Sequence, residues 1–313
     1  MLTKAQKKRN IKKIILGTNE NSGLVQKLIL YILLIGISYL FAYPLLNMIV
    51  KSFMSPEDLT DPSTVWLPTE FYFDNYSKAF NTLDFGKSFL NSVVITLIAA
   101  VFQTAVSAVT AYGLARFKLP YAKLIIILII FTYIIPTETL LIPRFVLFNN
   151  YKLLDTPLTF WLTSLFGQGL KSSLFILVFY QTFSNYPQSI DEAAEIDGAG
   201  RYTIFGKIAL PIARSGIVLT FLFSFVWYWN ETRQSGLYFG NVIKTLPMKL
   251  GSFAASYQRL YESSDALSGS TTNINEAISL AGTMLSILPI MILFVILQKQ
   301  FVESIEKSGI TGE

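Results

Sequence analysis

Six long stretches of almost entirely apolar residues constrain this chain more than any other feature of its sequence. A helix needs roughly 20 such residues to cross a hydrocarbon core of about 30 Å, because every backbone N–H and C=O group must be paired within the segment. Hydrophobic residues make up 52% of the chain and charged residues only 14%, a balance too apolar for a water-soluble domain. We therefore predict an all-α membrane protein with six transmembrane helices. They are expected at residues 25–50, 89–114, 121–143, 158–182, 213–230 and 277–297.

None of these stretches alternates between polar and apolar residues, so the sequence argues against a membrane β-barrel. The first stretch is too long for the apolar part of a signal peptide and lacks a small-residue cleavage site, so we expect it to remain in the protein. The chain then divides into a basic tail at residues 1–24, a transmembrane domain at 25–297 and a second tail at 298–313.

Lysine and arginine near the ends of the stretches predict the orientation in the membrane, because cytoplasmic loops are enriched in these residues. The leading segment MLTKAQKKRNIKK carries six cations, whereas residues 51–88 carry three lysines and six acids. We therefore expect the N terminus in the cytoplasm and, after six spans, the C terminus also. This orientation places the connections at 115–120 and 183–212 in the cytoplasm.

The net charge of +5 lies mostly in that leading segment. An anchor for anionic lipid headgroups explains it, so we expect membrane lipid and not nucleic acid as its partner.

The chain has no cysteine and no histidine. It therefore offers no disulfide, no thiolate nucleophile, no Cys/His zinc site and no imidazole acid or base. A phosphate-binding loop of the form G-x-x-x-x-G-K-[ST] is also absent, because Asn81 stands where the Gly86-Lys87-Ser88 sequence would need its first glycine. We expect no metal, no bound cofactor and no catalytic residue here, so any ATP used would be hydrolysed by another subunit.

Polar and aromatic side chains within the apolar stretches are candidates for a transport pathway, because a carboxylate near mid-bilayer costs about 2.5–3.5 kcal/mol. Glu138 lies between Pro136 and Pro143, which should kink or unwind the third stretch and bring the carboxylate near its external end. The fifth stretch ends in FVWYWNET, which would suit stacking on a sugar ring. A structural role for Glu138 and an interfacial aromatic belt for the tryptophans stay open as alternatives. The pathway candidates are Tyr133, Glu138, Trp227, Trp229, Asn230 and Glu231.

Residues 187–211 form a polar island between two apolar stretches. Ser189 and Glu192 fit a capping box, in which the hydroxyl and the carboxylate bind two free N–H groups at the start of a helix. That helix should end near Asp197, because Gly198 suits the left-handed conformation that follows many helices. The sequence therefore predicts a short helix of about two turns.

Small residues in this island predict close contact with another surface. Ile190, Ala193 and Ala194 share one face of the first helix, and methyl-sized side chains let a partner approach closely. A second helix from Arg201 should end at Leu210-Pro211. Its apolar residues at helical spacing, expected to lie on the membrane domain, are Tyr202, Phe205, Ile208 and Ala209. From these patterns alone, an ordinary amphipathic loop remains an alternative to a docking segment.

The island resembles the EAA loop in membrane subunits of bacterial ATP-binding-cassette importers, which reads E-A-A, three residues, G, nine residues, I, one residue, L-P. The matching residues are Glu192-Ala193-Ala194, Gly198, Ile208 and Leu210-Pro211. The resemblance covers nearly the whole chain from about residue 24 and is strongest to the carbohydrate-uptake branch, specifically the maltose-type second permease subunit. The motifs that carry it are NSVVIT, AYGLARFKLP, IPTETLLIPRFVLF, LLDTP, WNET, TLPMKL and LPIMILFVILQKQFVESIEKSGITGE.

This resemblance implies a type I importer fold in a bacterial cell membrane, with both termini in the cytoplasm. Its implied partners are a second homologous permease subunit, a cytoplasmic ATPase dimer that binds ATP and Mg, and an extracellular or periplasmic solute-binding protein. The implied cargo is a di- or oligosaccharide. The island would be the coupling helix that seats in a cleft of the ATPase. The residues implied in that coupling are Glu192, Ala193, Ala194, Asp197, Gly198, Ala199 and Phe205.

The sequence departs from that branch at two places. Residues 257–276 form a longer external loop than expected, and Arg144 stands where the family tends to have an apolar residue. Other classes keep a place as alternatives: an importer of this type for another solute, an ion-coupled secondary transporter, a channel, or a membrane enzyme. Uptake driven by an ion gradient with no ATPase subunit would indicate the secondary transporter.

Overall fold

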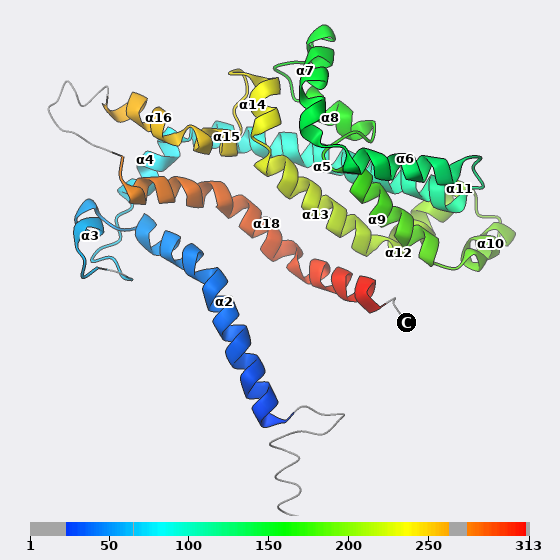
Figure 1. Ribbon diagram of the computed structural model, residues 1–313, viewed down its shortest axis with the longest axis horizontal. Helices are drawn as coiled ribbons and strands as arrows, with labels where there is room; N and C mark the ends of the chain where they lie inside the picture. The colour runs from blue at the N-terminus through cyan, green and yellow to red at the C-terminus, as the bar shows by residue number, and fades with distance from the viewer. Residues whose placement is uncertain (1–22, 65, 263–273, 311–313) are drawn as a thin grey trace, which may run out of the picture. The chain divides into compact units, whose positions relative to one another are not determined.

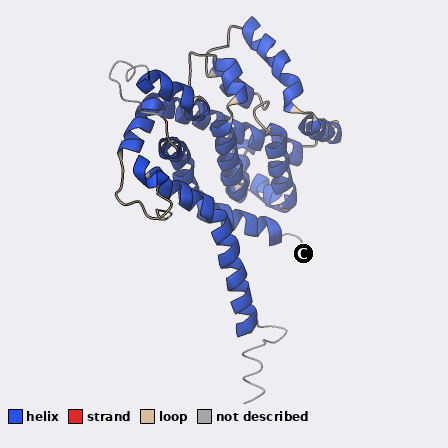
Figure 2. Ribbon diagram, turned by 60° about the vertical axis from the view of Figure 1, so that its left-hand side comes forward, coloured by secondary structure: helices blue, strands red, loops and turns tan. Residues whose placement is uncertain are grey.

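The structure, a computed structural model, describes residues 23–64, 66–262 and 274–310. Every regular element in these residues is a helix, and Figure 2 shows helices joined by loops with no strand among them. The prediction of an all-α protein is confirmed. Residues 1–22 of the basic tail and most of the external loop at 257–276 lie outside the described residues.

The chain divides into two compact units. Unit 1 contains residues 1–77 and 275–284, and unit 2 contains residues 78–274 and 285–313. The final helix, α18 (Glu276–Ile310), begins in unit 1 and ends in unit 2.

In unit 1, α2 (Leu24–Ser52) is a helix of 29 residues with an apolar surface. Leu40 and Phe41, for example, are 71% and 72% exposed. At about 1.5 Å per residue this helix is longer than a hydrocarbon core of roughly 30 Å, so lipid is the medium that suits its side chains. At the end of α2, Lys51 forms an ion pair with Glu276 at 2.9 Å.

Polar contacts hold the connection that follows α2. The buried Asn75 donates from Nδ2 to two backbone carbonyl oxygens at the end of α2, at 3.1 and 2.8 Å. The short helix α3 (Pro56–Thr60) begins with a capping box made by Ser55 and Asp58. The Thr69 hydroxyl donates to Asp58 at 2.7 Å, and this bond lowers the pKa of that carboxyl. The connection is therefore an ordered cap on the end of the first apolar helix.

Unit 2 is built around α5 (Phe85–Arg116), which runs alongside α9 (Ser172–Asn185) and α13 (Arg214–Asn230) (Figure 1). It also packs against α8 (Leu158–Leu165). The buried side chains of α5 are mostly small, which lets helices in a membrane approach closely. They include Ser92, Ala99, Ala100, Ser107, Ala108 and Ala111.

Shorter elements complete the described chain. They are α4 (Asp74–Thr82), α6 (Ala122–Ile134), the 3-10 helix η1 (Thr137–Leu140), α7 (Leu141–Asn150), α10 (Gln188–Ile196), α11 (Arg201–Ile204), the π-helical turn η2 (Phe205–Ala209), α12 (Leu210–Ile212), α14 (Arg233–Phe239), α15 (Leu246–Gly251), α16 (Phe253–Tyr257) and the π-helical turn η3 (Gln258–Glu262). The chain leading into α15 is bonded to α5, since the Leu246 N–H donates to Ser92 Oγ at 2.7 Å and Asn91 Nδ2 donates to the Lys244 carbonyl at 3.1 Å.

Two of the expected spans are interrupted. The third bends by 92° between α6 and the η1–α7 pair. Pro136 lies two residues after Ile134, the last residue of α6, and it lacks the N–H that would continue the helix. Pro143 instead lies in the first turn of α7, where an N–H has no intrahelical partner anyway, and causes no break. The fourth stretch, expected as one helix over 158–182, is the two helices α8 and α9, because Gly167 and Lys171 between them have left-handed φ values of 70° and 57°.

Three described helices are long and apolar enough to cross a membrane: α2, α5 and the part of α18 that ends at Gln300. Two bent pairs raise the number to five if each is one span. These pairs are α6 with η1–α7, and α11–α12 with α13, which bends by 76°. The expectation of six spans stays a prediction.

Candidate functional site

The polar island at residues 187–211, called here the EAA segment after its Glu-Ala-Ala sequence, folds as predicted at the end of its first helix. α10 ends just before Gly198, whose φ of +84° is left-handed. The Ala199 N–H donates to the Ala194 carbonyl at 2.9 Å and the Gly198 N–H to the Glu195 carbonyl at 3.0 Å. These two bonds form a Schellman motif, which satisfies carbonyl groups that the helix end would leave free.

The start of α10 differs from the prediction. Pro187 is the N-cap residue and no side chain caps the helix, while Ser189 lies exposed within it. The expected capping box between Ser189 and Glu192 is therefore wrong. The physical reason is that α10 begins at Gln188, directly after Pro187, so Ser189 is already the second helical residue. The third helical residue, whose side chain would complete a capping box, is Ile190, which has no acceptor.

A buried charge cluster holds the start of α10 against α5. Nε of Arg116, the last residue of α5, lies 3.2 Å from Oδ2 of Asp191, and the two side chains are 5% and 16% exposed. The guanidinium carbon lies 3.4 Å from the ring centroid of Tyr186, and Nη2 donates to the Tyr186 carbonyl at 3.1 Å. The Tyr186 hydroxyl donates to the two carboxylate oxygens of Asp191 at 2.9 and 3.1 Å. We call these three residues the Arg116 clamp, which joins α5, α10 and the residue after α9.

The protonation state of the clamp is defined by its surroundings. Burial, and then donation to Asp191, raises the pKa of the Tyr186 hydroxyl to about 12. The phenol therefore stays protonated and able to donate at physiological pH. Nε of Arg116 is not aligned to donate a hydrogen bond to Asp191, so these two groups attract each other as opposite charges at short range. Their low exposure reduces screening by water.

The outer surface of α10 is uncovered. Glu192 and Ala193 are exposed and Ala194 is half-buried. Ile196 is 87% exposed, and burying such a side chain contributes about 1.5–3 kcal/mol. Ile190 was predicted on this surface and Ile196 was not, although an isolated large apolar residue in a polar island is a signal for a contact surface. A partner that covers α10 would gain apolar burial.

The second helix of the EAA segment continues further than predicted. α11, η2 and α12 follow one another directly, and the bend comes after Ile212 and not at Leu210-Pro211. The wider π-helical turn just before Pro211 accommodates a residue that cannot donate the regular helical bond. Tyr202 is 94% exposed, so its expected place on a packed apolar face is wrong, and Ile204 is the buried residue instead.

The other residues implied in coupling lie in different surroundings. Asp197 is exposed at the end of α10, and Ala199 is half-buried in the turn after it. Phe205 packs its ring against Tyr112 of α5 at 4.9 Å between centroids. In this structure Phe205 therefore packs the EAA segment against α5 and is not part of its outer surface.

A cavity of about 610 Å³ lies between α10, α11 and the end of α5. Its charged lining residues have both signs: Arg116, Lys118, Asp191, Glu192, Glu195 and Arg201. The guanidinium carbon of Arg201 lies 5.1 Å from the centroid of Phe117. Because cations and acids surround this cavity together, it does not favour a ligand of one charge.

Comparison with known proteins shows the family to which this chain belongs. A family model described as "Binding-protein-dependent transport system inner membrane component" matches residues 103–307, more than half of the chain. The chain belongs to this family. The match runs from the middle of α5 into α18 and so contains the whole EAA segment.

Relatives cover most of this inner membrane component. It is 29% identical over 255 residues to "Osmoprotective compounds uptake permease protein GgtD" of Synechocystis sp. (strain ATCC 27184 / PCC 6803 / Kazusa), with 80% of this chain and 84% of that protein covered. It is 28% identical over 282 residues to "Probable starch degradation products transport system permease protein AmyC" of Thermoanaerobacterium thermosulfurigenes, with 90% and 96% covered.

A solved structure shares the fold. It is described as "Crystal structure of a bacterial ABC transporter involved in the import of the acidic polysaccharide alginate". The TM-score is 0.73 at 19% sequence identity, with 96% of this chain and 99% of that chain covered. The expectation of an importer permease fold is confirmed, and so is the recognition of the family from its motifs. This inner membrane component is thus a membrane-spanning transport subunit, and its family works with an ATPase and a substrate-binding protein.

Two of the pathway candidates lie near the bend of the third stretch. Tyr133 is exposed, and Lys171 Nζ lies 5.7 Å from its ring centroid. Glu138 is also exposed, and its Oε1 lies 3.9 Å from Nη1 of Arg233. The inner membrane component therefore joins the bend of the third stretch to the start of α14 through an exposed ion pair, which is worth at most about 1 kcal/mol.

The four candidates at the end of α13 have structural contacts. Trp229 is 2% exposed and Trp227 is half-buried, and both rings pack against phenylalanine rings. Asn230 Nδ2 donates to a carbonyl one turn earlier at 2.9 Å, and Glu231 Oε1 accepts the Gln234 N–H at 2.7 Å. In this conformation Trp229 is part of the core, and a pathway role for these four residues stays a prediction.

A buried polar network, which was not predicted from the sequence, lies at the α8–α9 break. Gln103 of α5 donates to the Leu170 carbonyl and accepts from the Tyr228 hydroxyl at 3.0 Å. The same hydroxyl accepts the Leu170 N–H at 3.0 Å and bonds with Ser164 Oγ at 2.6 Å. A Cβ atom at Gly169 would overlap Gln103 Oε1 and the Tyr228 hydroxyl. The sequence FGQGLK inside an apolar stretch, with two glycines and two polar residues, was the available signal.

Proposed function

We propose that this protein is a permease subunit of a bacterial ATP-driven importer for carbohydrate, a di- or oligosaccharide, and that it forms half of the translocation pathway with a second homologous subunit. Family membership supports the importer class. A carbohydrate is supported by the relative named for starch degradation products and by the structure of an alginate importer with the same fold. An importer of the same type for another solute is the second candidate, because one relative takes up osmoprotective compounds.

We further propose that the EAA segment docks on a separate ATPase dimer, which binds ATP and Mg and carries out hydrolysis. The observation that carries this proposal is that α10 is held by buried contacts on one side and exposed on the other. The Arg116 clamp holds α10 to α5, while Glu192, Ala193 and Ile196 are exposed. Glu192 would pair with a basic or polar group of the ATPase, and the alanines would allow close approach.

Rigid attachment is what would make α10 a coupling element. A displacement of α10 by the ATPase would pass to α5 and α9 through the buried Arg116 clamp and not be absorbed in a flexible loop. The free energy of ATP binding would then shift the balance between inward-open and outward-open conformations, provided that the ATPase binds α10 differently in the two.

Substitutions on this surface test the docking proposal. We expect Glu192→Lys combined with Ala193→Arg to abolish uptake and to prevent copurification of the ATPase. Gly198→Pro should do the same, because proline cannot adopt a φ of +84° and would remove the N–H that bonds to Glu195. Insertion of the protein into the membrane should not change.

The matched control is Glu57→Lys, the same charge reversal at an exposed acid in the first turn of α3. It should leave uptake and copurification as they are. Normal ATPase copurification together with normal sugar uptake in the EAA variants would refute the docking proposal.

The remaining proposals concern the assembly. Both termini and the EAA segment lie on the cytoplasmic side, and an extracellular or periplasmic solute-binding protein delivers the sugar to the opposite side. No cofactor binds to this chain itself.

A further inference from the structure

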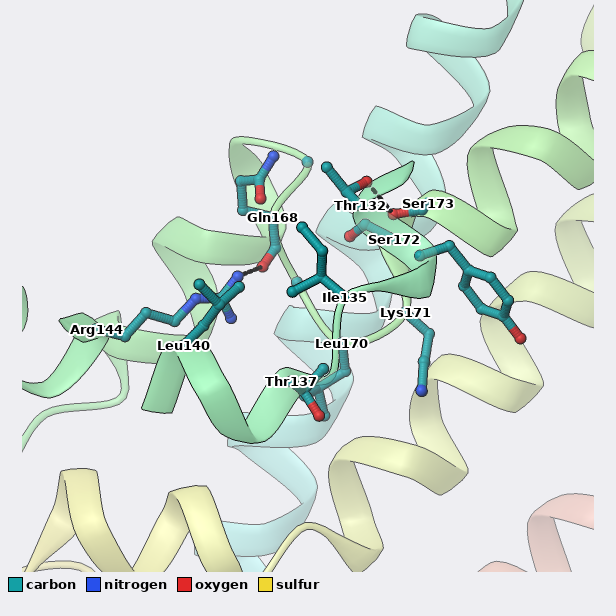
Figure 3. A pocket seen from close by; sticks show the side chains of 13 residues that line it. Thr132, Ile135, Thr137, Leu140, Arg144, Gln168, Leu170, Lys171, Ser172 and Ser173 are labelled. Atoms are coloured by element: carbon teal, nitrogen blue, oxygen red, sulfur yellow. Dashed lines mark hydrogen bonds between the residues drawn. The ribbon is translucent and has the colours of Figure 1, made fainter. Parts of the chain in front are cut away.

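A small polar pocket lies where the two interrupted stretches meet, between the α6–η1–α7 bend and the α8–α9 break (Figure 3). Its volume is about 100 Å³. One water needs about 10–15 Å³ of such space, so the pocket holds several waters or one substituent of a sugar. A complete disaccharide does not fit, so any solute would place only a part of itself here.

Two cations flank this pocket without an acidic partner. Arg144 lies on one side and Lys171 on the other, as Figure 3 shows. Arg144 is half-buried, and Nη2 donates to the Gln168 carbonyl at 3.3 Å, which leaves its other N–H groups for a ligand. In the described part of the chain, no carboxylate oxygen lies within 4.0 Å of either cation, and the nearby Glu138 pairs with Arg233.

The backbone adds to this positive character. α9 has 14 residues and begins at Ser172, and its N-terminal end lies at the pocket. The N–H groups of Ser172 and Leu174 are bonded to the carbonyls of Gly169 and Lys171, so the positive end of the helix dipole, more than free N–H groups, is what the helix offers an anion. No acidic residue lies in that turn to neutralise the helix dipole. A broken helix whose N-terminal end faces a cavity is an arrangement that favours an anionic group.

One buried hydroxyl at this place has no partner. Ser172 is 4% exposed and lines the pocket, and its Oγ makes no hydrogen bond within the described residues. The neighbouring Ser173 hydroxyl is bonded to Thr132 at 2.9 Å. A buried polar atom without a partner is unfavourable, so Ser172 would gain from a ligand oxygen.

We propose that this pocket is a subsite for an anionic substituent of the transported solute, such as the carboxylate of an acidic sugar. Arg144 binds the carboxylate directly, Ser172 donates a second bond, and Lys171 adds positive charge from the other side. The inference rests on the proposed function, since it assigns a chemical class of sugar to the same importer.

A binding experiment on the complete transporter without its solute-binding protein tests the subsite. The probes are D-galacturonate, its neutral methyl ester and D-galactose, and the readout is the shift in thermal unfolding midpoint on titration. We expect the wild-type transporter to bind galacturonate about tenfold more tightly than either neutral probe. Arg144→Gln should remove this preference, and Ser172→Ala and Lys171→Gln should each reduce it about threefold. Lys87→Gln, which removes an exposed cation outside the pocket, is the control and should have no effect.

Several outcomes would overturn the subsite. Equal affinities for the three probes in wild type, or an equal loss for all three in Arg144→Gln, would overturn the subsite. An anionic lipid headgroup shares this chemistry, so the titration is repeated in nanodiscs with and without phosphatidylglycerol. It would also be overturned if Arg144→Gln changed the response to the lipid but left galacturonate binding as in wild type. Uptake of neutral sugars by the reconstituted system separates the two proposals, since such uptake leaves the proposed function intact, whereas no ATP-dependent uptake of any sugar refutes both.

Discussion

At the residue scale, a single arginine decides how the EAA segment is held. Arg116 ends α5 and supplies the charge, the ring contact and the backbone bonds that fix the residues around the start of α10. Asp191 is 16% exposed, so its carboxylate depends on this partner for compensation. The clamp therefore makes the position of α10 sensitive to one side chain far from its contact surface.

Replacing Arg116 should loosen α10 without altering its outer surface. We expect Arg116→Met to lower the opening free energy of α10 by about 3 kcal/mol, because Asp191 would keep the Tyr186 hydroxyl but lose its cationic partner at a largely buried place. Hydrogen–deuterium exchange of the α10 amides measures this quantity. ATPase copurification should fall about tenfold or more. Arg201→Met is the control, since Arg201 is exposed and its guanidinium lies over the Phe117 ring, outside the three residues of the clamp. Unchanged exchange in Arg116→Met would contradict the role of the clamp.

The pKa of the Tyr186 hydroxyl predicts how the stability of α10 depends on pH. Its pKa in the folded protein, about 12, is above the usual value of 10.0, so its stabilising bond to Asp191 is complete below about pH 10 and is lost as the pH rises through about 12. Tyr186→Phe should cost α10 about 1.5–3 kcal/mol. The difference from wild type should be the same at about pH 6 and about pH 9, measured by hydrogen exchange corrected for the intrinsic rate. A difference that changes between these two values would show that another group controls the bond.

At the element scale, two breaks in the helices shape the packing of the membrane domain. Pro136 ends α6, and the Gly167-to-Lys171 turn separates α8 from α9. The second break lets backbone groups of Leu170 reach Gln103 and Tyr228 on neighbouring helices. Polar backbone away from lipid is tolerated in a membrane protein when neighbouring helices satisfy it, which is what this network does.

Gly169 is the position where this network allows least change. Gly169→Ala would place a methyl group on Gln103 Oε1 and the Tyr228 hydroxyl, and 3.0 Å from Ser164 Oγ. We expect a loss of roughly 2 kcal/mol in stability, seen as a lower thermal unfolding midpoint of the purified protein. Gly86→Ala is the matched control, because no atom lies within 4 Å of its added Cβ, and it should be neutral or slightly stabilising. Equal midpoints for the two variants would argue against tight packing at the α8–α9 break.

At the scale of the whole molecule, the helices bear on the number of spans and the loop charges on their orientation. The described chain contains three helices that suit a bilayer and two bent pairs that would bring the number to five. The α8–α9 pair would be the sixth crossing, since an interrupted helix can cross a membrane where its break is covered by protein. Charge bias in the loops predicts that the EAA segment lies in the cytoplasm.

Labelling of introduced cysteines tests this topology, and the natural chain contributes no background because it has no cysteine. Ser63→Cys, in the connection after α2, should react with a membrane-impermeant maleimide in intact cells. Ser184→Cys, near the end of α9, should react only after the membrane is opened. Both positions are exposed, so they differ in sidedness and not in access. Labelling of Ser184→Cys in intact cells would reverse the proposed orientation.

The all-α membrane class follows from the sequence alone, because lipid demands long apolar helices. The end of α10 at Gly198 and the bend at Pro136 also follow from it, because left-handed glycine and proline act on their immediate neighbours. The family was recognised from its sequence motifs. The Arg116 clamp, the polar network at Gly169 and the pocket beside Arg144 depend on residues far apart in sequence, and only tertiary packing brings them together. Tyr202 also depends on packing, which buries Ile204 and leaves Tyr202 in solvent. The expected role of Ser189 was wrong for a local reason, because α10 begins at Gln188, directly after Pro187.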